Sequence, residues 1–343
     1  MSRAGSNKLL HVAKKSKNDE FYTQLSDIES ELEYYQEHFR GKVVYCNCDD
    51  PRQSNFFNYF FLNFKSLGIK KLIAACYKEQ SNDLFDVKDN EKGFYFEYSG
   101  EEGDIKKLIN DKSVPFKFDG DFRSEESKSL LKQCDIVVTN PPFSLFREYV
   151  EQLVKNQKQF LIIGNINAIT YKEIFKLIKQ DKAWLGVKLG RGISGFIVPD
   201  HYELYGTEAR IDDNGKRIVS PNNCLWLTNL DHCKRHEKIN LTRCYLGNES
   251  EYPKYDNYDG INVNKTKNIP YDYAGAIGVP ITFLHKYNPE QFELIKFRKG
   301  DNEKDLSING KCPYFRILVR NKHYISSQTQ NRRTTLHASK LTA

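Results

Sequence analysis

The chain has 343 residues, of which 39% are hydrophobic and 13% aromatic, and its formal net charge is +7. This apolar content supports packed cores and excludes a disordered chain, while the length suits one large domain or two modest ones. No apolar run approaches the roughly 20 residues that span a bilayer, and the first residues lack the apolar core of a signal peptide. We therefore expect a cytoplasmic protein that does not associate with a membrane.

The positive charge gathers at the two ends of the sequence. Residues 1–18 contain several Lys and Arg residues and no acid, and no acid follows Asp305. This distribution favours a polyanionic partner such as nucleic acid, although a solvated tail would carry the same charge. The eight cysteines form no CxxC pair and show no zinc-ligand spacing, so we expect reduced, mostly buried thiols and no metal site.

In chain order, the first predicted element is a helix over residues 26–41. Ser26 and Glu29 form a capping-box pattern, and Gly41 ends the run. Its apolar face comprises Ile28, Leu32, Tyr35 and Phe39. Strands are then predicted at residues 43–46 and 70–77, on either side of a helix at residues 55–68.

Residues 80–120 are polar and predicted to be irregular, apart from a strand-like segment at residues 94–98. Regular alternation then resumes. Strands are predicted at residues 135–139, 159–163 and 183–187, and helices at residues 124–134, 144–156 and 171–180. Alternation of this kind predicts parallel βαβ units in an α/β fold with an open, doubly wound, mostly parallel sheet.

The composition changes near Trp184, after which Gly, Asn, Tyr and Pro are frequent. Asn214-Gly215 between alternating segments is a strong hairpin signal. We therefore divide the chain into a basic N-terminal arm (residues 1–18), an α/β domain (19–183), a β-rich domain (184–321) and a disordered tail (322–343).

Asn140-Pro141-Pro142-Phe143 directly follows the strand predicted at residues 135–139. Open α/β sheets bind ligands at the carboxyl ends of their strands, and the two prolines fix the turn. The Asn140 side-chain carbonyl and the Pro141 backbone carbonyl can accept hydrogen bonds from a planar exocyclic amine. Phe143 can stack on the ring that bears this amine. The alternative is a rigid strand exit without chemistry.

This tetrapeptide resembles the catalytic motif of S-adenosylmethionine-dependent amino-methyltransferases. Longer stretches, including "KVVYCNCDDPRQSNFFNYF", "YELYGTEARID" and "GVPITFLHKYNPEQFELIKFRKG", resemble EcoRI-type adenine-specific DNA methyltransferases, from about residue 7 to about residue 320. The resemblance implies S-adenosyl-L-methionine as cofactor and methyl transfer to N6 of a flipped adenine in double-stranded DNA. It also implies a restriction-modification system with a cognate restriction endonuclease, and GAATTC as the recognition site. We expect a monomer that needs no metal.

The resemblance also implies roles for individual residues. The α/β domain would be the catalytic domain, and the β-rich domain would recognise the target site. The implied catalytic residues are Asn140, Pro141, Pro142 and Phe143. The implied cofactor-binding residues are Phe21, Tyr22, Thr23, Asp49, Asp50, Pro51, Asp121 and Phe122. Without the resemblance, these would be interpreted as core residues and plain turns. The usual glycine-rich loop is missing, and Glu79 is a candidate for holding the ribose.

The predicted DNA-binding residues are Lys14, Lys15, Lys17, Lys188, Arg191 and Phe196. The lysines and Arg191 would contact phosphates, and Phe196 would lie near the flipped base, unless it is a core residue. Three alternatives keep part of this interpretation. RNA adenine or a protein glutamine presents the same planar amine, and a non-catalytic DNA-binding protein would explain the missing glycine loop.

Overall fold

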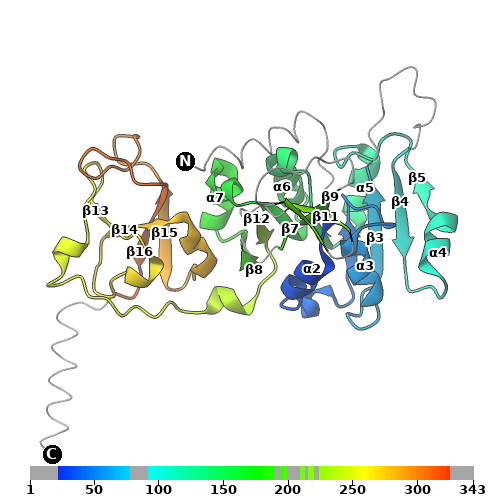
Figure 1. The fold of residues 1–343 in the computed structure, drawn as a ribbon, viewed down its shortest axis with the longest axis horizontal. Helices are drawn as coiled ribbons and strands as arrows, with labels where there is room; N and C mark the ends of the chain where they lie inside the picture. The colour runs from blue at the N-terminus through cyan, green and yellow to red at the C-terminus, as the bar shows by residue number, and fades with distance from the viewer. Residues whose placement is uncertain are drawn as a thin grey trace, which may run out of the picture. The chain divides into compact units, whose positions relative to one another are not determined.

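Figure 1 shows the fold in a computed structural model, which describes residues 22–77, 92–189, 194–198, 209–212, 215–219 and 224–324. The predicted arm and most of the predicted tail lie outside these ranges. The chain divides into two compact units. The first comprises Met1–Ile174 and Ala183–His232, and the second comprises Phe175–Lys182 and Cys233–Ala343.

The described part of the first unit is built on an eight-stranded sheet in the order β5-β4-β3-β2-β6-β7-β12-β8. Its strands are β2 (Val43–Cys46), β3 (Lys71–Cys76), β4 (Phe94–Tyr98), β5 (Val114–Pro115), β6 (Ile136–Thr139), β7 (Gln159–Asn165), β8 (Trp184–Leu189) and β12 (Cys224–Thr228). The central strands β3, β2, β6 and β7 pair in parallel, whereas β4 and β12 pair antiparallel with their neighbours. The strand β8 runs in the same direction as β7, but β12 lies between them.

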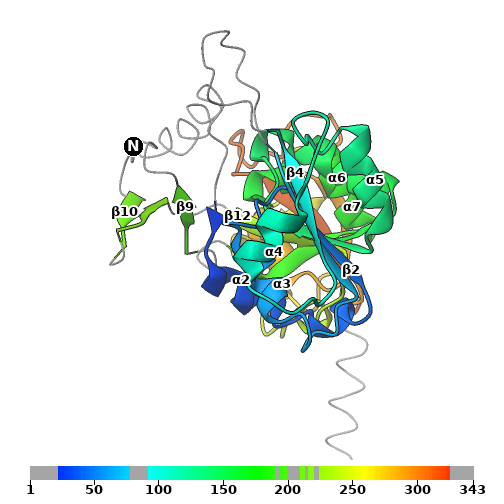
Figure 2. The same cartoon turned by 90° about the vertical axis from the view of Figure 1, so that its right-hand side faces the viewer.

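Helices lie on both faces of this sheet, which gives a mixed α/β fold. They are α2 (Leu25–Leu32), α3 (Asn55–Leu62), α4 (Ile105–Lys112), α5 (Glu125–Gln133) and α6 (Phe146–Lys155). A further helix, α7 (Lys172–Lys179), spans the division between the two units. Figure 2 shows α2, α3 and α4 on one side of the sheet and α5 and α6 on the other. On the first side, Leu32 and Phe57 share a buried core with Val44 of β2. On the second, Phe146 packs so closely on Gly164 that a Cβ there would lie 2.5 Å from the Phe146 ring.

A small sheet joins two segments that are far apart in the sequence. Its order is β1-β9-β11-β10, with strands β1 (Tyr22–Thr23), β9 (Phe196–Val198), β10 (Ala209–Ile211) and β11 (Arg217–Val219). Thr23 pairs with Phe196 across the antiparallel strands β1 and β9. The predicted hairpin is confirmed, because Ile211 pairs with Arg217.

The described part of the second unit carries a four-stranded sheet in the order β13-β14-β16-β15. Its strands are β13 (Gly260–Asn262), β14 (Ala276–Pro280), β15 (Phe292–Phe297) and β16 (Arg316–Asn321). The division between the units differs from the domain boundary predicted at residues 183 and 184. β8 and β12 extend the first sheet, and Trp226 of β12 is fully buried there, edge-on to Phe56 of α3.

Some predicted details of the first unit were wrong. The helix predicted at residues 26–41 ends at Leu32, and the helix predicted at residues 55–68 ends at Leu62. The helix α2 is N-capped by Gln24 without a side-chain hydrogen bond, so Ser26 and Glu29 form no capping box. Residues 80–120, which were predicted to be irregular, contain α4. This helix shows only a weak apolar pattern in the sequence, because Ile109 is its one buried residue.

The cysteines are less buried than expected. All eight are free, but Cys48 and Cys244 are half-buried and Cys233 and Cys312 are exposed. Within the described ranges, no helix is long and apolar enough to cross a membrane.

Candidate active site

The turn after β2 is held between the ends of two neighbouring strands. The backbone N–H of Asp49 donates to the carbonyl of Ala75 in β3 at 3.0 Å. Its carboxylate accepts hydrogen bonds from the Thr139 hydroxyl at the end of β6 at 2.5 Å and from the Ser54 hydroxyl at 2.7 Å. Ser54 also accepts the backbone N–H groups of Phe56 and Phe57, so it is the N-cap of α3. The helix start and the acidic turn are therefore fixed by one side chain.

The pKa of Asp49 lies above the usual range for an aspartate. Asp49 is only 7% exposed. Burial raises the pKa of Asp49 to about 6, although the hydrogen bonds from Thr139 and Ser54 act in the opposite direction. Neighbouring Asp50 is also buried and accepts the backbone N–H of Arg52 at 2.9 Å. A cation bound at this turn would stabilise the ionised form of Asp49.

The predicted catalytic motif begins one residue after Thr139. Asn140 and Phe143 are half-buried, Pro141 is buried, and the turn closes with the N–H of Leu145 donating to the carbonyl of Pro142 at 3.1 Å. Thr139, the residue before the motif, therefore donates a hydrogen bond to the Asp49 carboxylate. This bond joins the motif to the acidic turn after β2, which contains Asp49 and Asp50.

Two contacts in and around the motif join distant parts of the sequence. The ring of Phe196 in β9 lies edge-on to Phe143, with a centroid separation of 6.1 Å and an interplanar angle of 74°. Tyr149 of α6 donates its hydroxyl to the Asn47 side chain in the turn after β2. The structure thus places Phe196 beside Phe143, and Phe196 is also 1% exposed and part of the buried core, which is the alternative left open above. Asn47, Thr139 and Tyr149 join the site without having been singled out in the sequence analysis.

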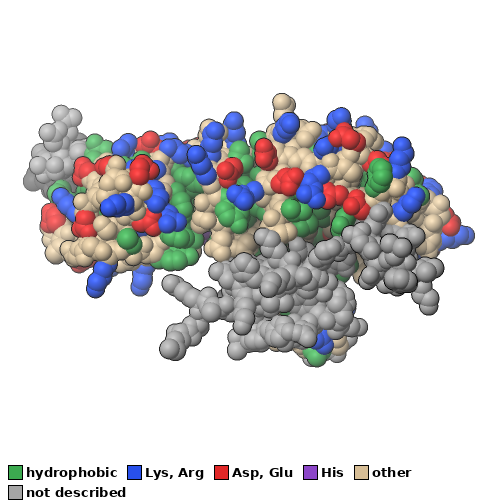
Figure 3. All heavy atoms as spheres, turned by 90° about the horizontal axis from the view of Figure 1, so that it is seen from above, with side chains coloured by type: hydrophobic (Ala, Val, Ile, Leu, Met, Phe, Trp, Pro, Cys, Tyr) green, Lys and Arg blue, Asp and Glu red, His purple; other side chains and the backbone are tan. Residues whose placement is uncertain are grey.

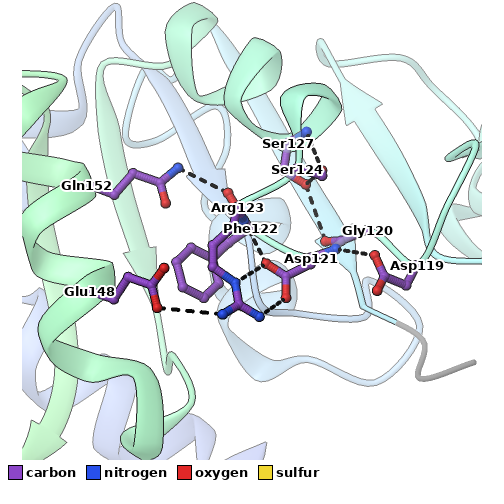
Figure 4. A network of polar contacts seen from close by, with 9 residues as sticks. All are labelled: Asp119, Gly120, Asp121, Phe122, Arg123, Ser124, Ser127, Glu148 and Gln152. Atoms are coloured by element: carbon purple, nitrogen blue, oxygen red, sulfur yellow. Dashed lines mark hydrogen bonds and ion pairs between the residues drawn. The ribbon is translucent and has the colours of Figure 1, made fainter.

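Figure 4 shows the polar network around Asp121. Both carboxylate oxygens of Asp121 accept from the Arg123 guanidinium, at 2.9 and 2.6 Å, and one also accepts the Arg123 N–H at 2.7 Å. Burial raises the pKa of Asp121, but these hydrogen bonds outweigh it, so its pKa is below the usual value. Arg123 also lies 3.6 Å from Glu148. Asp121 is therefore ionised. A ligand that donates a hydrogen bond to its carboxylate would do so beside the bonds from Arg123.

A cavity of about 390 Å³ lies beside this network. It is lined by Phe118, Asp119, Asp121, Arg123 and Ser124. The turn is closely packed at Gly120, where φ is +81° and a Cβ would lie 2.9 Å from the carbonyl oxygen of Cys76. This contact places the cavity at the end of β3, and its volume falls in the range of small-molecule sites.

Phe122 does not line this cavity. It is 5% exposed and packs edge-on against Tyr149 at 5.0 Å. Its carbonyl accepts from the Gln152 side chain at 3.0 Å. The exposed ring at the cavity is instead Phe118, which the sequence analysis did not single out.

The residues predicted near the methionine end of the cofactor occupy β1. Thr23 is buried, and its backbone carbonyl accepts from the Asn55 side chain at 2.7 Å, at the start of α3. Among the described residues, the buried Thr23 hydroxyl has no hydrogen-bond partner. A buried polar atom in this state fits a ligand that completes the site. Tyr22 is half-buried, and Phe21 and Glu79 lie outside the described residues.

Of the predicted DNA-binding residues, the structure describes Lys188 and Phe196. The Lys188 ammonium lies over the Tyr34 ring at 5.5 Å, and its backbone N–H donates to the Glu31 carboxylate at 2.7 Å. Lys14, Lys15, Lys17 and Arg191 lie outside the described residues. On the described part of the face in Figure 3, basic and acidic side chains are interspersed. Charge on this face therefore does not single out a DNA-binding area. The described ranges contain no group of three or more His, Cys, Asp or Glu residues suited to hold a metal ion.

Comparison with known families assigns the chain to a family. Residues 9–322 match the family described as adenine-specific methyltransferase EcoRI. The chain belongs to this family. It is an adenine-specific DNA methyltransferase, as the resemblance of its longer stretches implied.

Relatives of this EcoRI-type methyltransferase match over nearly their whole length. Type II methyltransferase M.EcoRI of Escherichia coli is 70% identical over 324 residues, covering 94% of this chain and 99% of that protein. Type II methyltransferase M.MpnI of Mycoplasma pneumoniae is 41% identical, covering 91% and 98%. M.MgeORF184P of Mycoplasma genitalium is 38% identical, covering 90% and 97%. No solved structure gives a significant match.

Proposed function

We propose that this protein is the modification enzyme of a restriction-modification system and methylates N6 of adenine within GAATTC in double-stranded DNA. The observation that carries the proposal is the Asn140-Pro141-Pro142-Phe143 turn, rigidly joined through Thr139 to the acidic turn at Asp49. The near full-length match to M.EcoRI supports the same assignment and is the reason for choosing GAATTC.

The cofactor of the proposed reaction is S-adenosyl-L-methionine, which supplies an activated methyl group when bound. Asp49 and Asp50 would hold its ammonium, because both carboxyl groups are buried at the end of β2. The partnerless Thr23 hydroxyl would bind its methionine end. The cavity at Phe118 and Asp121 would take the adenine ring. In this arrangement Phe122 acts behind the site, by packing on Tyr149.

The target adenine would be flipped out of the duplex, since its amine is otherwise inside the helix. The Asn140 side-chain carbonyl and the Pro141 backbone carbonyl would each accept a hydrogen bond from one N6–H group. These acceptors would favour the form in which N6 carries positive charge. The methylated N6 would be acidic enough to lose one proton to solvent, so no strong general base is required. Phe143 stacks on the base, and Phe196 supports Phe143 from the side.

The remaining assignments belong to the same proposal. The doubly wound sheet of the first unit would carry catalysis, and the region after residue 184 would recognise the target sequence. Lys188, Arg191 and the basic arm with Lys14, Lys15 and Lys17 would contact phosphates. The enzyme would act in the cytoplasm as a monomer without metal, and a cognate endonuclease would cut the same site when it is unmethylated.

The test is methyl transfer from labelled S-adenosylmethionine to a duplex with one GAATTC, beside a scrambled duplex, in the presence of a metal chelator. Label on the first duplex alone, located on adenine N6, is the expected result. Label on both duplexes would keep the chemistry and reject the recognition site. Cofactor binding without label on either duplex would reject GAATTC as the recognition site, and RNA and protein glutamine would then be assayed as substrates.

A further inference from the structure

The segment just before Phe196 is held by the start of α2. Asp27 is 5% exposed, and one oxygen of its carboxylate accepts both the backbone N–H of Ser194 at 2.8 Å and its hydroxyl at 3.0 Å. The Gln24 amide donates to the Ser194 hydroxyl at 2.6 Å and to the Gly195 carbonyl at 3.0 Å. We call Gln24 and Asp27 the α2 clamp. Four hydrogen bonds thus fix two consecutive residues of the segment.

These hydrogen bonds act directly on the position of the Phe196 ring. Phe196 follows Gly195 and is 1% exposed, and its backbone pairs with Thr23 of β1, which immediately precedes Gln24. The strand pairing fixes one side of Phe196, and the α2 clamp fixes the residues that lead into it. The edge-on contact with Phe143 depends on both, because the geometry of an aromatic pair sets its interaction energy.

Stability alone does not require this arrangement of side chains. Burying the Asp27 carboxylate raises its pKa above the usual value, and the hydrogen bonds from Ser194 and the charge of Arg210 offset only part of that effect. An apolar contact between α2 and the 194–195 segment would avoid this desolvation. A directional clamp instead specifies position, which a ring beside a reacting base needs.

We propose that Gln24 and Asp27 are positioning residues that hold Phe196 against Phe143 and so help to retain the flipped target adenine. The inference rests on the proposed function, since it takes the Phe143 face as the binding site of that base. Neither residue contacts the reacting atoms in this scheme. Misplacement of a supporting group by about 1 Å can reduce a rate about 100-fold, so loss of part of the clamp should have a measurable effect.

The test compares Asp27→Ala, Gln24→Ala and Asp27→Asn, whose amide oxygen can still accept from Ser194. Phe196→Leu serves as the reference for loss of the ring, and Asp111→Ala on the exposed face of α4 is the matched control. We expect single-turnover methyl transfer to fall about tenfold in Asp27→Ala and Gln24→Ala, with cofactor and DNA affinities within about twofold of wild type. Asp27→Asn should recover most of the rate, and Asp111→Ala should match wild type.

Two further measurements separate positioning from folding and from failure of the proposed function. With 2-aminopurine at the target position, the fluorescence increase on binding should be smaller in Asp27→Ala and Gln24→Ala than in wild type. In protein labelled with 4-fluorophenylalanine, the Phe196 ¹⁹F resonance, identified by its loss in Phe196→Leu, should shift in both variants without DNA. An unmoved resonance, or an unchanged rate in Gln24→Ala, would overturn the inference. If the resonance shifts in the variants but the wild-type protein methylates neither duplex, the proposed function is rejected instead. The role of the α2 clamp in holding adenine is then rejected with it.

Discussion

Replacing Thr139 with valine tests the link between the catalytic motif and the acidic turn. Valine keeps the shape of this fully buried side chain and removes the hydroxyl that donates to Asp49 at 2.5 Å. A hydrogen bond to a charged group contributes about 1.5–3 kcal/mol, so the free energy of unfolding should fall by about 1.5 kcal/mol or more. The same loss destabilises the ionised form of Asp49 in the folded protein.

The consequence for the cofactor can be estimated from the pKa of Asp49. One pKa unit corresponds to about 1.4 kcal/mol, so the pKa should rise from about 6 to roughly 7. If the ionised carboxylate binds the cofactor ammonium, affinity falls as the pH drops through that pKa. At pH 6 the ionised fraction would fall from about one half to about one tenth, which raises the apparent Kd roughly fivefold. At pH 8 both proteins are mostly ionised, and the Kd should change by less than about 1.5-fold.

Calorimetric titration with S-adenosylmethionine at pH 6 and pH 8, together with urea unfolding, measures both effects. Thr228→Val is the matched control, because Thr228 is also fully buried at a strand end but bonds neutral backbone groups. Its hydroxyl donates to the Phe160 carbonyl at 2.7 Å and accepts the Leu230 N–H at 3.0 Å. This variant should lose stability without a pH-dependent change in Kd. If the ratio of the Thr139→Val Kd to the wild-type Kd is the same at pH 6 and pH 8, the role of ionised Asp49 is refuted.

Three other substitutions test separate parts of the site. Asn140→Ala should lower the single-turnover rate about 10²–10³-fold with cofactor and DNA affinities nearly unchanged, and an unchanged rate would exclude Asn140 as an N6 acceptor. Burial raises the pKa of Glu31 from 4.5 to about 7, so its contribution to stability becomes less favourable as the pH rises through that window. Urea unfolding should therefore show the stability of Glu31→Gln, relative to wild type, increasing by roughly 2–3 kcal/mol between pH 4.5 and 7, and a constant difference would contradict this. Gly120→Ala should destabilise the fold by at least about 2 kcal/mol more than Gly41→Ala, because both have positive φ but only Gly120 is crowded, with Phe116 2.7 Å from the added Cβ. Thermal unfolding compares the two variants, and equal losses would show that crowding at Gly120 is relieved at little cost.

The sequence by itself determined the features that depend on local pattern. The buried strands β2 and β6 were predicted from continuous apolar runs, and the hairpin from Asn214-Gly215. The Asn140–Phe143 turn was also predicted from neighbouring residues, because two prolines after an apolar strand restrict the backbone wherever they occur. The residue types predicted activation of a planar amine, and the resemblance of the longer stretches implied adenine in DNA.

Only the tertiary structure decided which distant groups meet. Thr139 and Asp49 are 90 positions apart, and no local pattern indicates that a strand-end hydroxyl will hold that carboxylate. The hydrogen bonds from Arg123 to Asp121 depend on side-chain direction in a turn. Side-chain direction also decides that Phe118 lies at the cavity while Phe122 packs on Tyr149. Insertion of β12 beside β7 was equally unpredictable, because an apolar strand can pair in either direction. Periodicity reports whether a residue is buried, whereas the partner that it meets is set by how the whole chain packs.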